Sequence, residues 1–92
     1  MPSTDDRIAV VGARLAQARR FNGFSAADVA SHLGIARSSL SLYEAGKRDV
    51  RISVFLAMAD LYRVDVRWLL GYTDEFVLVV PRPAPAYEHE RE

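Results

Sequence analysis

The sequence predicts a compact all-α domain of five helices, followed by a short C-terminal extension. Apolar residues recur at the spacing of an amphipathic helix through most of residues 8–70, and this period favours helices over strands. The pattern stops near Gly34, Gly46 and Gly71, where a chain leaving a helix often turns left-handed. The chain has 92 residues, 50% of them hydrophobic, which suffices for one modest core and no second domain.

The first helix is expected to run from a cap at Ser3 or Thr4 to about Phe21. Asp5 and Asp6 suit its first turn, because carboxylates there interact favourably with the helix dipole. Its buried stripe comprises Ile8, Val11, Leu15 and Ala18.

The second helix has a clear start at Ser25, which can cap it. Asp28 stands where a carboxylate completes a capping box, and Phe24 and Val29 are spaced for a hydrophobic staple. Its apolar edge consists of Val29, Ala30 and Leu33. Gly34 then permits a tight left-handed turn, and Ile35 is expected to plug the core beneath it.

The third helix, over residues 36–45, contains the candidate functional side chains. At about 100° per residue, Leu40 and Tyr43 face one side and anchor the helix. The outward residues are Arg37, Ser38, Ser41 and Leu42. Arginine pairs with guanine edges, serine donates or accepts, and an apolar tip fits a thymine methyl group. This pattern is typical of a helix in the major groove, and it equally describes an ordinary solvated helix face.

Two further helices complete the expected domain. A fourth helix, from about Ile52 to Tyr62, is expected to bury Phe55, Leu56, Ala59 and either Leu61 or Tyr62. Asp65 can cap a short fifth helix that holds Trp68, Leu69 and Leu70 and closes at Gly71.

Several short motifs follow one another in a recognisable order. They are Arg19, Gly23-Phe24-Ser25, Val29-Ala30, Leu33-Gly34-Ile35, Ser39-Leu40-Ser41, Tyr43-Glu44, Gly46-Lys47-Arg48 and Trp68-Leu69-Leu70-Gly71. This order, spread between Ile8 and Gly71, resembles the Cro/phage-repressor type of helix-turn-helix domain, also called the XRE family. The resemblance implies a lambda-repressor-like fold whose third helix reads the major groove, usually as a dimer on a near-palindromic operator.

The resemblance also implies roles for individual residues. Arg37, Ser38, Ser41 and Leu42 map onto base-reading positions. Contacts to the DNA backbone are expected from Ser25, Ser39, Lys47, Arg48 and Arg51. Arg19 and Glu44 map onto an ion pair that ties the first helix to the recognition helix.

Three residues depart from the family pattern. Ala26 replaces a glutamine that commonly contacts a phosphate, so phosphate binding there must rely on backbone amides at the start of the helix. Ala36 replaces the serine or threonine that usually caps the recognition helix, a change that typically costs about 1 kcal/mol. Arg63 replaces the glycine that usually ends the fourth helix, which predicts a differently shaped turn.

The formal net charge is zero, whereas DNA-binding domains are commonly basic. The charges are segregated, however. Between Arg19 and Arg51, six Lys and Arg residues face three Asp and Glu residues, whereas from Thr73 onward two face five. The sequence therefore predicts a mildly basic domain over residues 1–72 with an acidic extension over residues 73–92, and more dependence on the specific site than on non-specific attraction.

The extension begins with an apolar run, Phe76–Val80, that favours a β-strand. A lone strand leaves a hydrogen-bonding edge open, so pairing between two copies is expected, and folding back onto the chain's own helices is the alternative. The residues assigned to dimerisation are Trp68, Leu70, Phe76, Val77, Leu78, Val79 and Val80. The proline-punctuated, charged segment beyond them predicts a disordered tail.

Composition excludes several other functions. The chain has no cysteine, which fits a reducing cytoplasm, and no apolar stretch long enough for a signal peptide or a membrane span. His32 and His89 are too few and too far apart to suggest a metal site, and no base stands ready to activate the serines. We therefore expect no enzymatic activity, no metal and no cofactor.

Two functional classes remain open from sequence alone. The first is a sequence-specific DNA-binding transcriptional regulator, a repressor that binds a palindromic operator as a homodimer and that an antirepressor protein could release. Symmetry would place its two recognition helices about 34 Å apart. The second is a protein-interaction module of the same fold, antitoxin-like or coactivator-like, in which the strand or the tail holds a partner.

Overall fold

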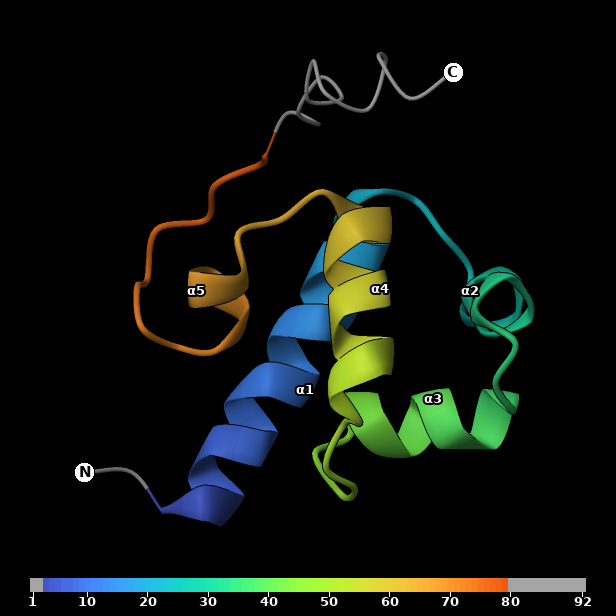
Figure 1. Ribbon diagram of the computed structural model, residues 1–92, viewed down its shortest axis with the longest axis horizontal. Helices are drawn as coiled ribbons and strands as arrows, with labels where there is room; N and C mark the ends of the chain where they lie inside the picture. Colours follow the sequence, from blue (N-terminus) through green and yellow to red (C-terminus); the bar gives the residue numbers. More distant parts are fainter. Residues whose placement is uncertain (1–2, 80–92) are drawn as a thin grey trace, which may run out of the picture.

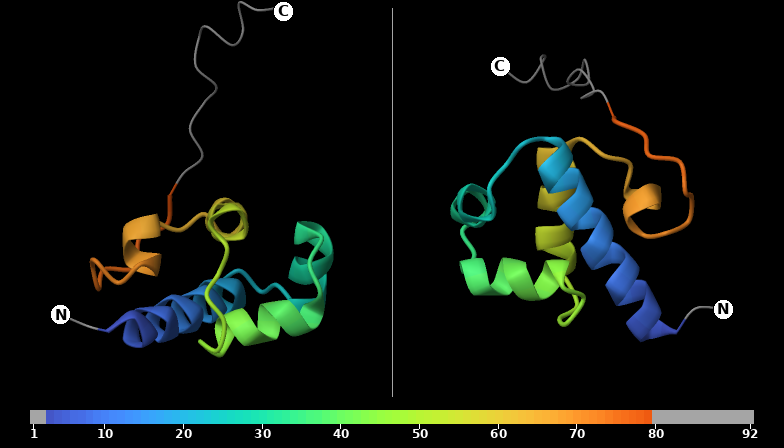
Figure 2. Two further views of the ribbon diagram at one scale, coloured as in Figure 1. Left: turned by 60° about the horizontal axis from the view of Figure 1, so that its bottom comes forward. Right: turned by 180° about the vertical axis from the view of Figure 1, so that it is seen from behind.

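The computed structural model describes residues 3–79, and within that range the chain forms five α-helices. They are α1 (Thr4–Phe21), α2 (Ala26–Leu33), α3 (Arg37–Glu44), α4 (Ile52–Tyr62) and α5 (Val66–Leu69). The helices α1 and α4 cross in the middle of the molecule, with α2 and α5 on opposite sides of them (Figure 1 and Figure 2). The compact all-α class predicted from the sequence is confirmed.

Side-chain caps begin three of these helices. The hydroxyl of Ser3 accepts from the Asp6 amide at 3.1 Å, and the Asp6 carboxylate accepts from the Ser3 amide at 3.4 Å, which completes a capping box. Ser25 accepts from the Asp28 amide at 3.1 Å, so the cap expected there forms, although only this half of the capping box is present. Asp65 caps α5, and its hydrogen bonds from the side chain and amide of Arg67 lower the pKa of the Asp65 carboxyl.

A left-handed residue follows α2, as the sequence predicts. Gly34 has a φ of 69°, and the Ile35 amide donates to the Ala30 carbonyl at 3.0 Å. The Gly34 amide donates to the Ser31 carbonyl, so the two bonds form a Schellman motif. This tight turn sets the angle between α2 and α3.

The end of α4 departs from the expectation that Arg63 reshapes the turn. Arg63 adopts the left-handed conformation itself, with φ 56° and ψ 46°, and the Val64 amide donates to the Ala59 carbonyl. Glycine would adopt this conformation without steric cost, whereas a residue with a Cβ is destabilised there by about 1 kcal/mol. The turn therefore keeps its shape at an energetic cost.

The core lies where the five helices meet. It comprises Leu15, Ala18, Val29, Ala30, Leu40, Phe55, Met58, Ala59, Tyr62, Val64, Trp68 and Leu69. Leu56, which we expected to be buried, is 48% exposed, because the inward stripe of α4 runs through Phe55, Met58, Ala59 and Tyr62. Tyr62 rather than Leu61 is the fully buried residue at the end of this helix.

The strand expected over Phe76–Val80 does not form in the described residues, and Val80 and the tail beyond it lie outside them. Within residues 3–79 a single antiparallel bridge is present, between Val64 and Leu78. The ring of Phe76 instead packs against Phe21 and Trp68, with centroid distances of 5.1 and 4.7 Å. Because Phe76 finds these apolar partners within its own chain, residues 73–79 fold back onto the helices.

Two arginines of α1 fasten this returning segment. Arg14 donates to the carbonyls of Trp68 and Thr73 at 2.5 and 2.6 Å, and its guanidinium lies over the Trp68 ring. Arg7 donates to the Leu70 carbonyl at 2.8 Å and lies over the ring of Tyr72. A cation at the carboxyl end of a helix is favourable, so these contacts stabilise α5 and the turn that follows it.

The backbone of α1 lies against the end of α3. A Cβ built at Gly12 would overlap the carbonyl oxygen of Tyr43 and would crowd that of Glu44, and one at Gly46 would lie 2.8 Å from the Cα of Ala9. Glycine at both positions therefore lets the two backbones touch. Sequence reasoning missed this contact, although a glycine inside a helical pattern often signals a close approach.

We expect Gly12→Ala to lower the free energy of unfolding by about 1–3 kcal/mol, because the added methyl group meets backbone that cannot move aside. Helix propensity alone predicts that Gly12→Ala raises the free energy of unfolding, since alanine is more favourable than glycine inside a helix by up to about 1 kcal/mol. Chemical denaturation measures the difference. The control is Ala13→Gly at the neighbouring exposed position, which should lower the free energy of unfolding only by the difference in helix propensity. A Gly12→Ala chain as stable as the wild type would refute the close contact.

Candidate nucleic-acid interface

Two buried side chains fix the rotation of α3. Leu40 and Tyr43 are 0% and 5% exposed and point into the domain. Arg37, Ser38 and Ser41 are all exposed on the remaining surface of the helix. The structure thus brings these three predicted base-reading residues onto one solvent-facing side of the helix.

The fourth predicted base-reading residue and its neighbour are less accessible. Leu42 is half-buried, and its carbonyl accepts the Lys47 amide at 3.0 Å in the motif that ends α3. Ser39, assigned to the DNA backbone, is also half-buried, and its hydroxyl accepts from the Arg48 guanidinium at 3.4 Å. This bond holds Arg48 beside α3.

The loop between α3 and α4 presents the other predicted backbone contacts. Lys47, Arg48 and Arg51 are exposed there. They follow directly on the carboxyl end of α3, whereas Ser25 lies at the start of α2. The Ser25 hydroxyl accepts the cap bond from Asp28, and its proton remains able to donate.

A buried ion pair joins α1 to α3, as the family resemblance implied. Arg19 donates from Nε and Nη2 to the two carboxylate oxygens of Glu44 at 2.7 and 3.0 Å, and from Nη1 to the Phe24 carbonyl at 2.9 Å. The two side chains are 13% and 12% exposed. Hydrogen bonding to Glu44 raises the pKa of Arg19 above its usual value, so the guanidinium of Arg19 is charged across the physiological pH range.

Tyr62 lies close to this pair. Its hydroxyl is buried, and it has no hydrogen-bond partner among residues 3–79. Desolvation, and to a smaller extent the Glu44 charge, raise the pKa of Tyr62, so the phenol is neutral. The ring packs near Phe24, with centroids 6.3 Å apart, and supports the turn that Arg19 holds.

The amino end of α3 lacks a side-chain cap, as Ala36 predicts. The first amides of a helix have no partners within it, so those of α3 are left to solvent or to a bound group. Ala26, the other departure, is half-buried in the first turn of α2 and packs against the core. Neither alanine removes a residue from the exposed side of α3.

The residues assigned to dimerisation divide into two groups. Trp68 is 3% exposed, and Leu70 and Phe76 are half-buried, all within one chain. Val77, Leu78 and Val79 are 40%, 48% and 46% exposed. Of the assigned residues that the structure describes, the accessible ones therefore form the three-residue stretch from Val77 to Val79, and Val80 lies outside the described range.

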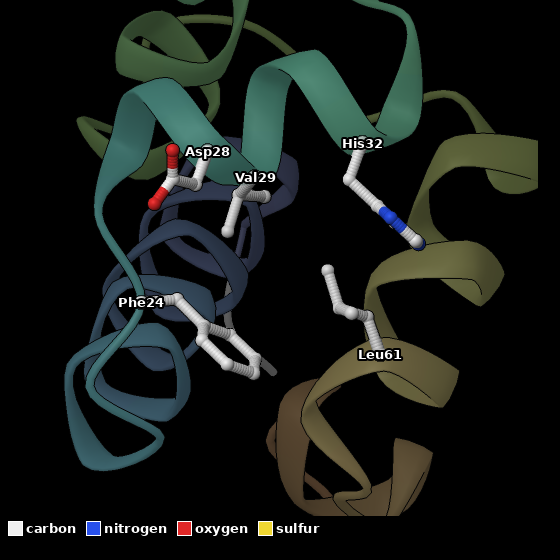
Figure 3. A pocket seen from close by; sticks show the side chains of 5 residues that line it. All are labelled: Phe24, Asp28, Val29, His32 and Leu61. Atoms are coloured by element: carbon white, nitrogen blue, oxygen red, sulfur yellow. The ribbon is translucent and has the colours of Figure 1, made fainter.

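A hollow of about 200 Å³ lies between α2 and α4 (Figure 3). Phe24, Val29 and Leu61 give it an apolar lining, with Asp28 and His32 also at its wall. Residues 3–79 contain no group of three potential metal ligands, and His89 lies outside them. Within the same range no helix combines the length and hydrophobicity needed to cross a membrane.

A short helix, a glycine turn and a second helix with a polar, basic outer side define a helix-turn-helix protein. A family model described as a helix-turn-helix domain matches residues 10–68. The chain therefore belongs to the helix-turn-helix family of DNA-binding transcriptional regulators, which is not a family of enzymes.

Two curated relatives from Bacillus subtilis (strain 168) are similar to this chain. The HTH-type transcriptional regulator ImmR is 36% identical over 61 residues, which cover 66% of this chain and 48% of ImmR. The uncharacterized HTH-type transcriptional regulator YobD is 36% identical over 62 residues, which cover 67% of this chain and 55% of YobD. The chain thus spans about half the length of these relatives. No solved structure gives a significant match.

We expect Arg19→Met and Glu44→Gln each to lower the free energy of unfolding by about 1–3 kcal/mol, because each leaves its partner unpaired in a mostly buried site. The double variant should lose about 1–2 kcal/mol less than the sum of the two single variants. Denaturation of all four proteins measures this coupling. The Asp65–Arg67 pair is the control, because its Arg67 side chain is 74% exposed and should show no measurable coupling. Additive losses for Arg19 and Glu44 would mean that the pair does not fasten α1 to α3.

Proposed function

We propose that this protein is a sequence-specific repressor that binds a palindromic operator as a homodimer, with α3 in the major groove. The observation that carries the proposal is the exposed side of α3. Arg37, Ser38 and Ser41 face solvent there, while Leu40 and Tyr43 lock the opposite side into the core. A major groove accepts an α-helix, and these side chains suit base edges.

The reading residues have distinct roles in this proposal. Arg37 pairs with a guanine, whose O6 and N7 match the two donors of a guanidinium. Ser38 and Ser41 donate to or accept from neighbouring base edges. Leu42 is half-buried, so only the outer part of its side chain contacts a thymine methyl group.

The backbone contacts flank this helix on both sides. Lys47, Arg48 and Arg51 neutralise phosphates beyond the carboxyl end of α3, with Arg48 positioned by its bond from Nη1 to Ser39. At the other side, Ser25 and the uncapped amides of α3 take the phosphate contacts that Ala26 and Ala36 cannot make through side chains. These contacts set the register and leave base discrimination to α3.

Two-fold symmetry connects the protein to its site. In a homodimer, two copies of α3 would face half-sites one helical turn, about 34 Å, apart. Occupancy of such a site would block transcription in the cytoplasm, and release would follow from the level of expression or from an antirepressor protein. No small ligand or cofactor takes part in this proposal.

Selection of bound sequences from random duplex DNA, at a stated salt concentration, tests the proposal. We expect a palindromic consensus. On that operator, Arg37→Ala should cost about 1–3 kcal/mol of binding free energy and relax the preference at one base of each half-site. Lys47→Ala should instead weaken all sequences alike and reduce the salt slope by about 1 for each copy of the chain.

Arg67→Ala is the matched control for charge, because Arg67 is an exposed arginine on α5, on the other side of α1 and α4 from α2 (Figure 1). Its operator affinity should stay near that of the wild type. Equal losses for Arg37→Ala and Arg67→Ala would contradict base reading by α3, and the absence of any consensus would favour a protein-interaction module.

A further inference from the structure

The segment from Val77 to Val79 uses one of its two hydrogen-bonding edges for bonds among residues 3–79, and the other edge makes none within that range. The Val77 carbonyl accepts from the Asp65 amide at 3.2 Å, and the Val79 amide donates to the Arg63 carbonyl at 2.7 Å. Both bonds lie on the side that faces Val64, opposite Leu78 in the bridge. In an extended strand, successive residues direct their polar groups to opposite edges. The amide and the carbonyl of Leu78 therefore point away from the domain, and neither is bonded among residues 3–79.

This edge is held firmly by the rest of the domain. Phe76 is packed between Phe21 and Trp68, and Arg14 binds the carbonyl of Thr73 just before it. The segment therefore presents its outer edge in a defined orientation. It lies on the opposite side of the molecule from α3 (Figure 1 and Figure 2), so a partner bound there leaves the proposed DNA surface free.

We propose that this edge pairs with the same segment of a second copy, antiparallel and centred on Leu78. The amide of each Leu78 donates to the carbonyl of the partner's Leu78, which is the hydrogen-bonded pair that two-fold symmetry permits at a single residue. This inference rests on the homodimer of the proposed function, and it names the residue that lies on the symmetry axis.

The apolar side chains select this register. Centred on Leu78, the pairing sets Leu78 opposite the partner's Leu78 and Val77 opposite the partner's Val79, so exposed apolar side chains cover one another. Centred on Val77, the pairing would set Val79 opposite the partner's Glu75, an exposed charged residue. A second copy also fits better than an unrelated strand, because the apolar residues of this edge match the same residues of an identical edge in the antiparallel orientation.

Disulfide trapping in the full 92-residue chain tests the register, since the natural sequence has no cysteine. In the proposed pairing the two Leu78 Cα atoms lie about 5.5 Å apart, which a disulfide can span. Leu78→Cys chains should form covalent dimers on mild oxidation, and so should a mixture of Val77→Cys and Val79→Cys chains. Val77→Cys alone should remain largely monomeric on a non-reducing gel, because its Cα atoms lie about 7–8 Å apart on the diagonal. Preferential trapping of Val77→Cys alone, or of none of these variants, would overturn the register.

A pair of proline variants tests the hydrogen bonds. Leu78→Pro removes the outward amide and should raise the dimer dissociation constant in sedimentation equilibrium about tenfold or more, because two symmetric bonds are lost. Val77→Pro is the control: it removes an inward amide that makes no bond among the described residues, and it should change the constant by less than about threefold. A dimer dissociation constant of Leu78→Pro equal to that of the wild type would refute the pairing.

Operator binding separates this inference from the proposed function. If Leu78→Pro still binds a selected palindrome as a dimer, the Leu78 pairing is wrong and the repressor proposal stands. If Leu78→Cys is trapped while the wild-type chain selects no DNA consensus, the pairing stands and the repressor proposal falls. A wild-type chain that sediments as a monomer at all concentrations overturns the pairing.

Discussion

The contact between α1 and the carboxyl end of α3 is the constraint on which the rest of the structure depends. Gly12 lets the α1 backbone touch the carbonyls of Tyr43 and Glu44, and Gly46 allows the same close approach from the other side. The bidentate bond between Arg19 and Glu44 closes the contact at its far end. Because α3 is held at these points, it has one orientation. A helix that recognises a DNA sequence needs this kind of preorganisation.

Several features of the proposed DNA surface follow from that constraint. With α3 fixed, Leu40 and Tyr43 face inward and Arg37, Ser38 and Ser41 face outward without further adjustment. The neutral net charge of the chain is compatible with this surface because the charges are segregated along the sequence. A weak overall field makes the affinity depend on contacts at the correct site more than on attraction to any phosphate backbone.

Much of this organisation could be predicted from the sequence, because it depends on local chemistry. The caps at Ser3 and Ser25 and the turn at Gly34 follow from hydrogen bonds within a few residues. The partner of Gly12 and the packing of Phe76 on Phe21 could not be predicted, because each depends on how distant elements meet. The strand expected over Phe76–Val80 does not form in its described part for the same reason, since among residues 3–79 the segment is bridged only to the single residue Val64. The exposure of Leu56 was missed although the helical period of α4 indicates it. The base-reading assignments remain predictions.

One measurement tests the central claim most directly: the amide chemical shifts of the ¹⁵N-labelled full chain during titration with an operator duplex. If the exposed side of α3, held by α1, binds DNA, the largest changes will fall on Arg37, Ser38 and Ser41 and on the loop at Lys47 and Arg48. The amides of Val77 to Val79 should then change little. Large changes there, with α3 unaffected, would contradict the account.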